Sequence, residues 1–241
     1  MVRVGCSGWQ YRHWRDAFYP LRLRQASWFE HYASVFDTVE LDGTFYRLPS
    51  EATVDGWRAR APAHFLFAMK ASRYLTHVKR LRNPEEPLAL FWSRARLLGG
   101  ALGPVLYQLP PTLRRDDARL AAFLAALPSE RQAIEFRHPS WYVDGTFQAL
   151  ASARVALCLH DMPGSSPPRE RIGPFVYVRL HGATERYRSG YPDRPLRDWA
   201  RWLRTLPRSV PAFVYFNNDA EAHAPRDALR LRGMVAQRAA L

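Results

Sequence analysis

The sequence predicts a (β/α)8 barrel, in which eight parallel strands form a closed sheet and helices cover its outside. Eight apolar segments of strand length recur along the chain, and helical patterns separate them. Most of these segments lack the polar alternation of a half-solvated sheet, so we expect them to be covered on both faces. The chain has 241 residues, which is close to the size that eight such units require.

The predicted strands are short, and several are rich in β-branched and aromatic residues. In chain order they cover residues 2–6, 38–41, 65–70, 104–109, 132–136, 155–161, 174–180 and 213–217. No linker or change in composition divides them, so we expect a single domain over residues 1–241. An open doubly wound sheet is the competing architecture, but the stretch GCSGW does not match the glycine pattern of a dinucleotide-binding loop.

About seven helices are expected between the strands. Ser27 and Glu30 form a capping-box pattern at the start of one helix, and Asp116 can cap another. Two more helices are predicted from apolar residues at helical spacing, over 88–98 and 196–206. The segment that follows the sixth strand is too rich in Pro and Gly for a full helix, so the sixth helix is expected to be degenerate.

Polar residues end every predicted strand from the second to the eighth. Active sites of (β/α)8 barrels lie at the carboxyl ends of the strands, and side chains two apart on a strand share a face. These two rules assign nine residues to the inside of the barrel mouth: Glu40, Lys70, Gln108, Glu135, Arg137, Asp161, Arg179, His181 and Asn217. The same alternation places Ile134 and Val178 outside the barrel. It also places His160 and Asn218 outside, where a packing or capping role is expected.

Four of these residues are the predicted catalytic groups: Glu40, Lys70, Glu135 and His181. A carboxylate could act as general base, the imidazole as general acid, and the lysine could stabilise an oxyanion. A Schiff-base role for Lys70 is disfavoured, because surrounding carboxylates would keep its pKa high.

Substrate binding is predicted for the remaining inward residues, for His138 and for two loop aromatics. This set is Gln108, Arg137, His138, Asp161, Arg179, Asn217, Trp9 and Tyr46. Paired arginine donors suit a phosphate or a carboxylate, which indicates an anionic or carbohydrate-like small molecule. The alternative is a ring of polar groups that only satisfy one another inside the barrel.

Two other kinds of chemistry fit the same carboxylates. A divalent metal could be held by Glu40, Glu135, Asp161 and His181, as in a metal-dependent hydrolase or isomerase. Three cations in the same ring would repel a further cation, so no metal site is assigned. A glycosidase would use carboxylates on opposing strands, which strands two and five could supply.

The chain is strongly basic, with 35 Lys and Arg against 22 Asp and Glu and a formal net charge of +13. Such a charge suits a polyanion, and loop aromatics such as Tyr74 could stack on bases or sugar rings. However, the arginines are scattered, and Lys70 and Lys79 are the only lysines, which indicates a bias in composition. Nucleic-acid binding is therefore the alternative to a small-molecule enzyme.

Targeting signals are not evident in the sequence. The first residues lack the order of a secretory signal, and no apolar run approaches the length of a membrane span. Cys6 and Cys158 each lie in an apolar run and are expected to be buried free thiols. These features predict a cytoplasmic protein without a membrane partner.

Seven motifs, taken in order, resemble those of the domain of unknown function 72 family, also called YecE-like. They are SGWQYRHWRDAFYP, VELDGTFYRLP, FAMKASRYLTH, LYQLPP, AIEFRHPSW, YVRLHG and YFNND. The resemblance covers nearly the whole chain and implies a TIM-type barrel, but it implies no reaction. It places ten polar residues in family motifs: Glu40, Lys70, Gln108, Glu135, Arg137, His138, Arg179, His181, Asn217 and Asn218. The family pattern has Asn two places after the Glu, whereas this chain has Asp42, so an amide-specific role is not expected there.

Overall fold

The computed structural model describes residues 1–165 and 167–237 and forms the predicted barrel. Its strands are β1 Val2–Cys6, β2 Thr38–Leu41, β3 Leu66–Lys70, β4 Leu102–Gln108, β5 Gln132–Glu135, β6 Ala156–Asp161, β7 Val176–Leu180 and β8 Ala212–Phe216. Neighbouring strands are parallel, in the order β1-β8-β7-β6-β5-β4-β3-β2. All eight overlap the segments predicted from the sequence.

The ring closes between β1 and β2. Ser7 and Glu40 form a parallel bridge there, and the Gly8 amide donates to the Glu40 carbonyl over 2.8 Å. Gly5 lies at this seam, where an added Cβ would stand 2.2 Å from the Thr38 carbonyl oxygen. Glycine therefore allows the two strands to approach one another and close the barrel.

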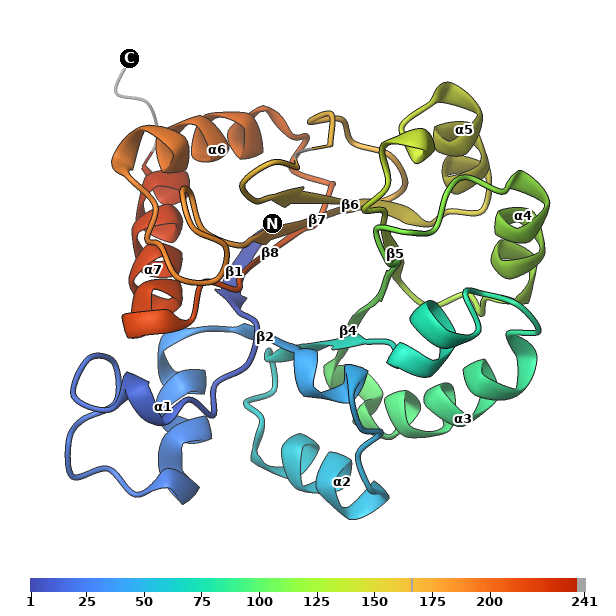
Figure 1. The fold of residues 1–241 in the computed structure, drawn as a ribbon. Coiled ribbons are helices and arrows are strands. Elements are labelled where there is room, and N and C mark those ends of the chain that lie inside the picture. The colour runs from blue at the N-terminus through green and yellow to red at the C-terminus, as the bar shows by residue number, and fades with distance from the viewer. Residues whose placement is uncertain (166, 238–241) are drawn as a thin grey trace.

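Helices surround the strands on all sides (Figure 1). They are α1 Trp28–Val35, α2 Glu51–Arg60, α3 Glu85–Ala95, α4 Asp117–Ala126, α5 Asp144–Ser152, α6 Asp193–Thr205 and α7 His223–Ala236. Between β6 and β7 the described residues form no helix, which confirms the degenerate sixth unit. Among the residues that the structure describes, no helix has both the length and the apolar character needed to cross a membrane.

Two of the predicted helix ends can be compared with the structure. Asp116 caps α4 as predicted, because its carboxylate accepts from the Arg119 amide over 3.0 Å. The capping box at Ser27 is wrong, since the Ser27 side chain forms no capping hydrogen bond. Glu30 instead pairs with Arg60, with 2.6 Å between Oε1 and Nε. This ion pair across two helices takes the carboxylate away from the helix start.

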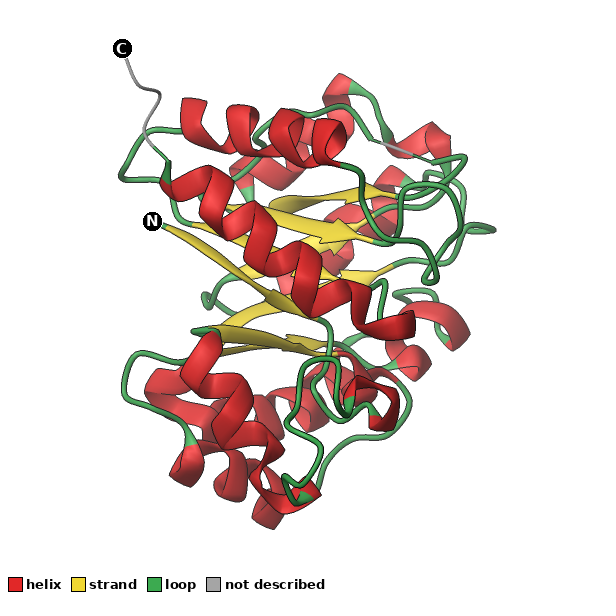
Figure 2. Cartoon of the chain, turned by 90° about the vertical axis from the view of Figure 1, so that its left-hand side faces the viewer, coloured by secondary structure: helices red, strands yellow, loops and turns green. Residues whose placement is uncertain are grey.

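Two apolar clusters fill the molecule. The larger one joins the outer faces of the strands to the helices and includes Ile134 and Val178, as predicted. The smaller one contains strand residues inside the barrel, among them Ala133, Tyr177 and Tyr215. The side view shows all strands pointing one way, with long loops at their carboxyl ends (Figure 2). The polar residues of the strand ends therefore lie between the inner apolar cluster and these loops.

Candidate functional site

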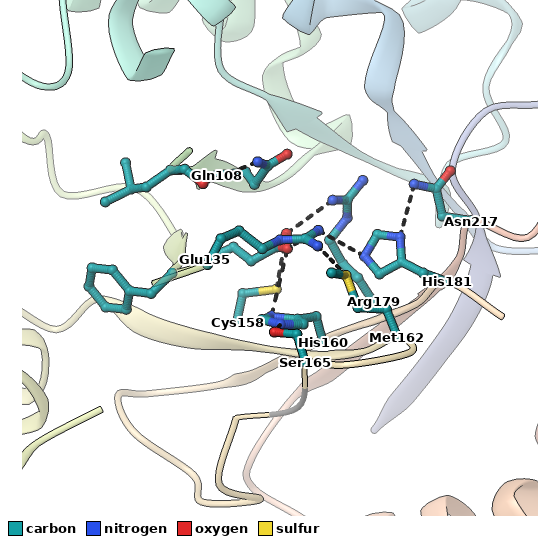
Figure 3. Close-up of polar contacts among 12 residues, drawn as sticks. Gln108, Glu135, Cys158, His160, Met162, Ser165, Arg179, His181 and Asn217 are labelled. Atoms are coloured by element: carbon teal, nitrogen blue, oxygen red, sulfur yellow. Dashed lines mark hydrogen bonds and ion pairs between the residues drawn. The ribbon is translucent and has the colours of Figure 1, made fainter. Parts of the chain in front are cut away.

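A buried ion network lies inside the barrel, and the Arg179 guanidinium is its centre. Figure 3 shows the part of this network around Glu135, Arg179 and His181. Arg179 donates to Glu135 Oε2 over 3.0 Å and to Glu40 Oε1 over 2.8 Å. Its Nη2 also lies 3.2 Å from Asp42 Oδ1. The side chains of Arg179, Glu40 and Glu135 are at most 1% exposed. A charged group buried this deeply needs such partners, because it has lost its hydration.

The Glu40 carboxylate is fully occupied by hydrogen bonds. Its Oε1 accepts from Ser7 Oγ over 2.6 Å and from Arg179, while its Oε2 accepts from Tyr177 Oη over 2.6 Å. Ser7 follows β1, and Tyr177 and Arg179 lie on β7, so Glu40 links β2 to the neighbouring strand β1 and across the barrel to β7. A carboxylate with both oxygens engaged and no exposure has no access to a substrate, which does not match the general-base role predicted for it.

Glu135 is held in its charged form by two arginines. Arg137 Nη2 contacts its Oε1, although that contact lacks the geometry of a hydrogen bond, and Arg179 contacts its Oε2. Burial by itself would raise the pKa of Glu135, but Arg137 and Arg179 hold it well below the usual range. Glu135 is therefore an ionised anchor for the arginines and a poor proton acceptor.

His181 lies beside the same two arginines. Its Nε2 is 3.1 Å from Arg137 Nη2, and its Nδ1 is 3.3 Å from the amide nitrogen of Asn217. Burial, together with the charges of Arg179 and Arg137, lowers the pKa of His181 well below its ordinary value. A neutral imidazole of this kind does not match the general-acid role that we predicted.

The assignment of faces on β6 is wrong by one residue. His160 points into the barrel, with its Nδ1 3.7 Å from Glu135 Oε1, and burial lowers its pKa to about 4. Asp161 points outward and accepts a 2.8 Å hydrogen bond from the Trp199 indole on α6. Asp161 therefore anchors a helix and does not belong to the inward ring. The segment VALCLHD is apolar on both faces, so its alternation carried no information about which face is inside.

Lys70 and Asp42 form an ion pair at the edge of the network. Lys70 Nζ lies 2.9 Å from Asp42 Oδ1 and 4.2 Å above the centre of the Phe45 ring. The Asp42 side chain is 25% exposed, in contrast to the carboxylates below it. Both of its cationic partners contact Oδ1, and Oδ2 forms no hydrogen bond with any described residue. Asp42 thus presents one carboxylate oxygen away from the network.

The pKa values of this pair follow from their surroundings. Burial and the charge of Arg179 lower the pKa of Lys70, despite the adjacent Asp42. This corrects our expectation that carboxylates would keep the pKa of Lys70 high. Burial opposes ionisation of Asp42, but Lys70 and Arg179 outweigh it and lower the pKa of Asp42.

A cavity of about 770 Å³ lies over Asp42. Its walls come mainly from the loops after β1 and β2 and from α2, and they include Trp9, Tyr11, Arg47, Trp57 and Arg94. Trp9 is only 5% exposed and packs against Phe29 and Trp57. The cavity therefore has an aromatic wall, two arginines and the open edge of the ion network on its boundary.

The structure places some of the other predicted binding residues at the ion network and others away from it. Arg137 and Asn217 join the network, and Gln108 lies nearby, donating to the Leu109 carbonyl over 3.2 Å (Figure 3). His138 instead caps a short turn, because its Nδ1 accepts from the Ser140 amide over 3.2 Å. Tyr46 is 77% exposed and lies in a separate groove. Asn218 donates to Ser189 and Asp227, which agrees with the packing role expected for it.

Sequence reasoning missed three polar members of the site. Asp42 lies two residues after Glu40 and so shares its face, but no site role was predicted for it. Tyr177 lies two residues before Arg179 and so shares its inward face, but nothing in the sequence indicates a partner for its hydroxyl. Ser7 follows β1 and carried no signal, because its contact with Glu40 depends on how the barrel closes.

The metal ligands that we considered do not assemble. Glu40 and Glu135 direct their oxygens at Arg179, and Asp161 faces α6. Across residues 1–165 and 167–237, no group of three His, Cys, Asp or Glu side chains is arranged to hold a metal ion. Three cations beside the carboxylates also disfavour another positive charge.

Comparison with known proteins gives the family. The family described as "Protein of unknown function DUF72" matches residues 3–241. The chain belongs to this family. The UPF0759 protein YunF of Bacillus subtilis is 26% identical, over 93% of this chain and 91% of that protein. The UPF0759 protein YecE of Escherichia coli is 31% identical, but over 60% of this chain and 52% of YecE, so the match spans about half of that relative.

Solved structures agree with the barrel. A DUF72 family protein from Thermotoga maritima has a TM-score of 0.88 at 27% identity, covering 98% of this chain and 100% of that chain. The D-psicose 3-epimerase of Clostridium cellulolyticum, solved with D-tagatose, has a TM-score of 0.56 at 11% identity. It covers 97% of this chain and 95% of its own, and this likeness shows the shared fold alone.

Proposed function

We propose that this DUF72 protein is an enzyme that performs acid/base chemistry on a small polar, anionic or carbohydrate-like substrate at the barrel mouth. The observation that carries the proposal is the position of the Lys70–Asp42 pair. The buried ion network reaches a cavity at Asp42, which lines the cavity and contacts Lys70 over 2.9 Å. Perturbed charged groups beside a cavity are typical of catalytic sites.

The pair supplies two complementary groups. Lys70 can donate a hydrogen bond to a carbonyl or hydroxyl oxygen of the substrate, and Asp42 Oδ2 can take a proton from the neighbouring atom. Removal of a proton from carbon leaves its electron pair as an enolate, whose oxygen faces the lysine. When a substrate oxygen accepts the Lys70 hydrogen bond in place of Asp42, Asp42 loses its nearest cation. The pKa of Asp42 then rises, and its carboxylate becomes a better base.

The deeper charges are expected to position this pair. Arg179 holds Asp42 Oδ1 at 3.2 Å, and Glu40 and Glu135 in turn fix the Arg179 guanidinium. The carboxylate is therefore anchored by one oxygen and presents the other. Preorganisation by a rigid shell of this kind reduces the rearrangement that a reaction would otherwise require.

The cavity supports a small polar substrate. Its volume, about 770 Å³, is in the range of metabolite sites. The tryptophan wall can pack on the apolar face of a sugar ring, and Arg47 and Arg94 can attract a phosphate or carboxylate.

The test is a metabolite panel enriched in sugars, sugar acids and sugar phosphates, screened by thermal shift on the parent protein. Asp42→Asn and Lys70→Met are measured beside it, with Asp55→Asn and Lys79→Met as matched controls outside the cavity. Compounds that stabilise the parent are then incubated with each protein, and product formation is followed by NMR.

We expect ligand stabilisation in the parent and in both controls, and at least a hundredfold slower product formation in Asp42→Asn and Lys70→Met. Turnover that survives both substitutions would refute the assignment of the pair. A panel that stabilises none of the proteins would count against this substrate class.

A further inference from the structure

A second groove lies beside the mouth, between the loops after β2 and β3 and the start of α3. Its volume is about 600 Å³, and its lining includes Tyr46, Arg73, Tyr74, Val78 and Leu90. The two tyrosines are 77% and 54% exposed, respectively, and Val78 and Leu90 are more than half exposed. We call this surface the tyrosine groove. Large side chains are rarely left this exposed together unless they contact a partner.

Buried residues fix the backbone segments that carry the two tyrosines of this groove. Tyr46 packs edge-on against Phe45 with 4.9 Å between ring centres, and Phe45 itself lies under Lys70. Tyr74 begins a π-helical turn, Tyr74–Val78, whose Leu75 and Thr76 are fully buried. Aromatic rings held in this way can stack on a planar group with little loss of conformational freedom.

The loops that carry the tyrosines are basic. Five basic residues lie within eight positions of Tyr46 or Tyr74 in the sequence: Arg47, which also lines the cavity over Asp42, and Arg73, Lys79, Arg80 and Arg82. None of the five forms an ion pair with a carboxylate in the part of the chain that the structure describes. On α6, in contrast, exposed arginines are paired with aspartates of the same helix. Arg73 and Glu86 are the charged residues of the groove lining, and Lys79 Nζ lies 5.8 Å from the centre of the Tyr74 ring. Two cations at the groove thus stand against one carboxylate.

We propose that the tyrosine groove binds single-stranded nucleic acid. Exposed aromatic faces beside unpaired arginines match what an unpaired strand offers, because its bases can stack while its phosphates meet the cations. A duplex keeps its bases inside and cannot use the tyrosines. The groove adjoins the cavity over Asp42 at Leu48, but neither Lys70 nor Asp42 lines it, so the proposal does not depend on the chemistry of that pair.

The experiment is fluorescence anisotropy with a labelled twelve-nucleotide oligo(dT), the same length of oligo(U), and a duplex of equal length. The variants are Tyr46→Ala, Tyr74→Ala and Arg73→Gln. Tyr187→Ala and Arg201→Gln are the controls, because they remove an exposed aromatic and an exposed arginine from other loops and helices. Melting temperatures are recorded for all five, and Tyr46→Phe and Tyr74→Phe keep each ring while removing its hydroxyl.

Each Tyr→Ala change is expected to weaken binding of the single strand about tenfold, and each Tyr→Phe change to leave it near the parent value. Arg73→Gln is expected to reduce the slope of log affinity against log salt by about 0.7. Tyr187→Ala and Arg201→Gln are expected to bind as the parent does.

Three results would overturn the proposal. They are a parent protein that does not bind the oligonucleotides at low salt, a duplex bound as tightly as a single strand, and control variants weakened as much as the tyrosine variants. The Lys70–Asp42 assignment would stand in each of these cases, because it is tested by turnover of small molecules.

Discussion

Replacing Arg179 by Met tests whether the centre of the ion network is structural. Methionine retains much of the length of the side chain but removes the charge and all of its donors. Glu40, Glu135 and Asp42 would each lose a contact. We expect a large loss of stability, because two of these carboxylates have no exposure to water and cannot recover their hydration.

The size of the loss can be estimated from the remaining contacts. Removing one partner of a buried ion pair costs about 3–5 kcal/mol of unfolding free energy. The three contacts of Arg179 should not be added, because Glu135 retains Arg137, Asp42 retains Lys70, and Glu40 retains the hydroxyls of Ser7 and Tyr177. At about 2–4 °C per kcal/mol for a chain of this size, the melting temperature should fall by about 6–20 °C.

The loss should also depend on pH with a definite sign. The pKa of Glu135 is depressed in the folded parent, so its stabilising contribution is present above the unfolded carboxyl pKa, about 4.3, and is lost as pH falls through the folded value. Without Arg179 the pKa of Glu135 rises toward or above that of the unfolded chain. The difference between parent and variant should therefore be largest at neutral pH and should shrink below about pH 4.

The assays are thermal melting at neutral pH and urea denaturation at several pH values, with Arg201→Met as control. Arg201 pairs with Asp198 on the surface of α6, where both side chains are well exposed, so its loss should cost at most about 1 kcal/mol. An Arg179→Met protein that melts within 2–3 °C (about 1 kcal/mol) of this control would refute the structural reasoning. It would return Arg179 to the set of substrate-binding residues.

Two further predictions concern the barrel seam and the buried His160. Gly5→Ala should destabilise the protein by several kcal/mol, because its Cβ would collide with the Thr38 carbonyl. Gly56→Ala in α2 meets no atom and should be neutral or stabilising. Equal denaturation midpoints for the two variants would contradict the close approach of β1 and β2. The pKa of His160 lies at about 4 in the folded state. Between about pH 4 and 6.5 this histidine is therefore protonated in the unfolded chain but neutral in the folded protein, so the free energy of unfolding should rise with pH by about 1.4 kcal/mol per pH unit. His160→Asn should reduce this slope by that amount, and an unchanged slope would show that His160 is not buried in its neutral form.

The architecture and much of the inward ring could be predicted from the sequence. Strand length, apolar runs and the helical patterns between them depend on neighbouring residues, so they could be recognised locally. On β5 and β7 the polar residues alternate with apolar ones, and Glu135 and Arg179 therefore point inward as predicted, opposite Ile134 and Val178.

Which of these residues pair, and which remain accessible, could not be predicted before the fold was known. Glu40 and Arg179 are 139 positions apart, and their contact depends on the diameter of the barrel and the stagger of its strands. The faces of β6 could not be assigned because both sides of that strand are apolar along most of its length. Asp42 gained its role in the same way, since the fold buries Glu40 completely and leaves the next residue on its face at the edge of the cavity. Depth of burial is set by all the strands and loops around a residue, and the alternation within one strand carries no information about it.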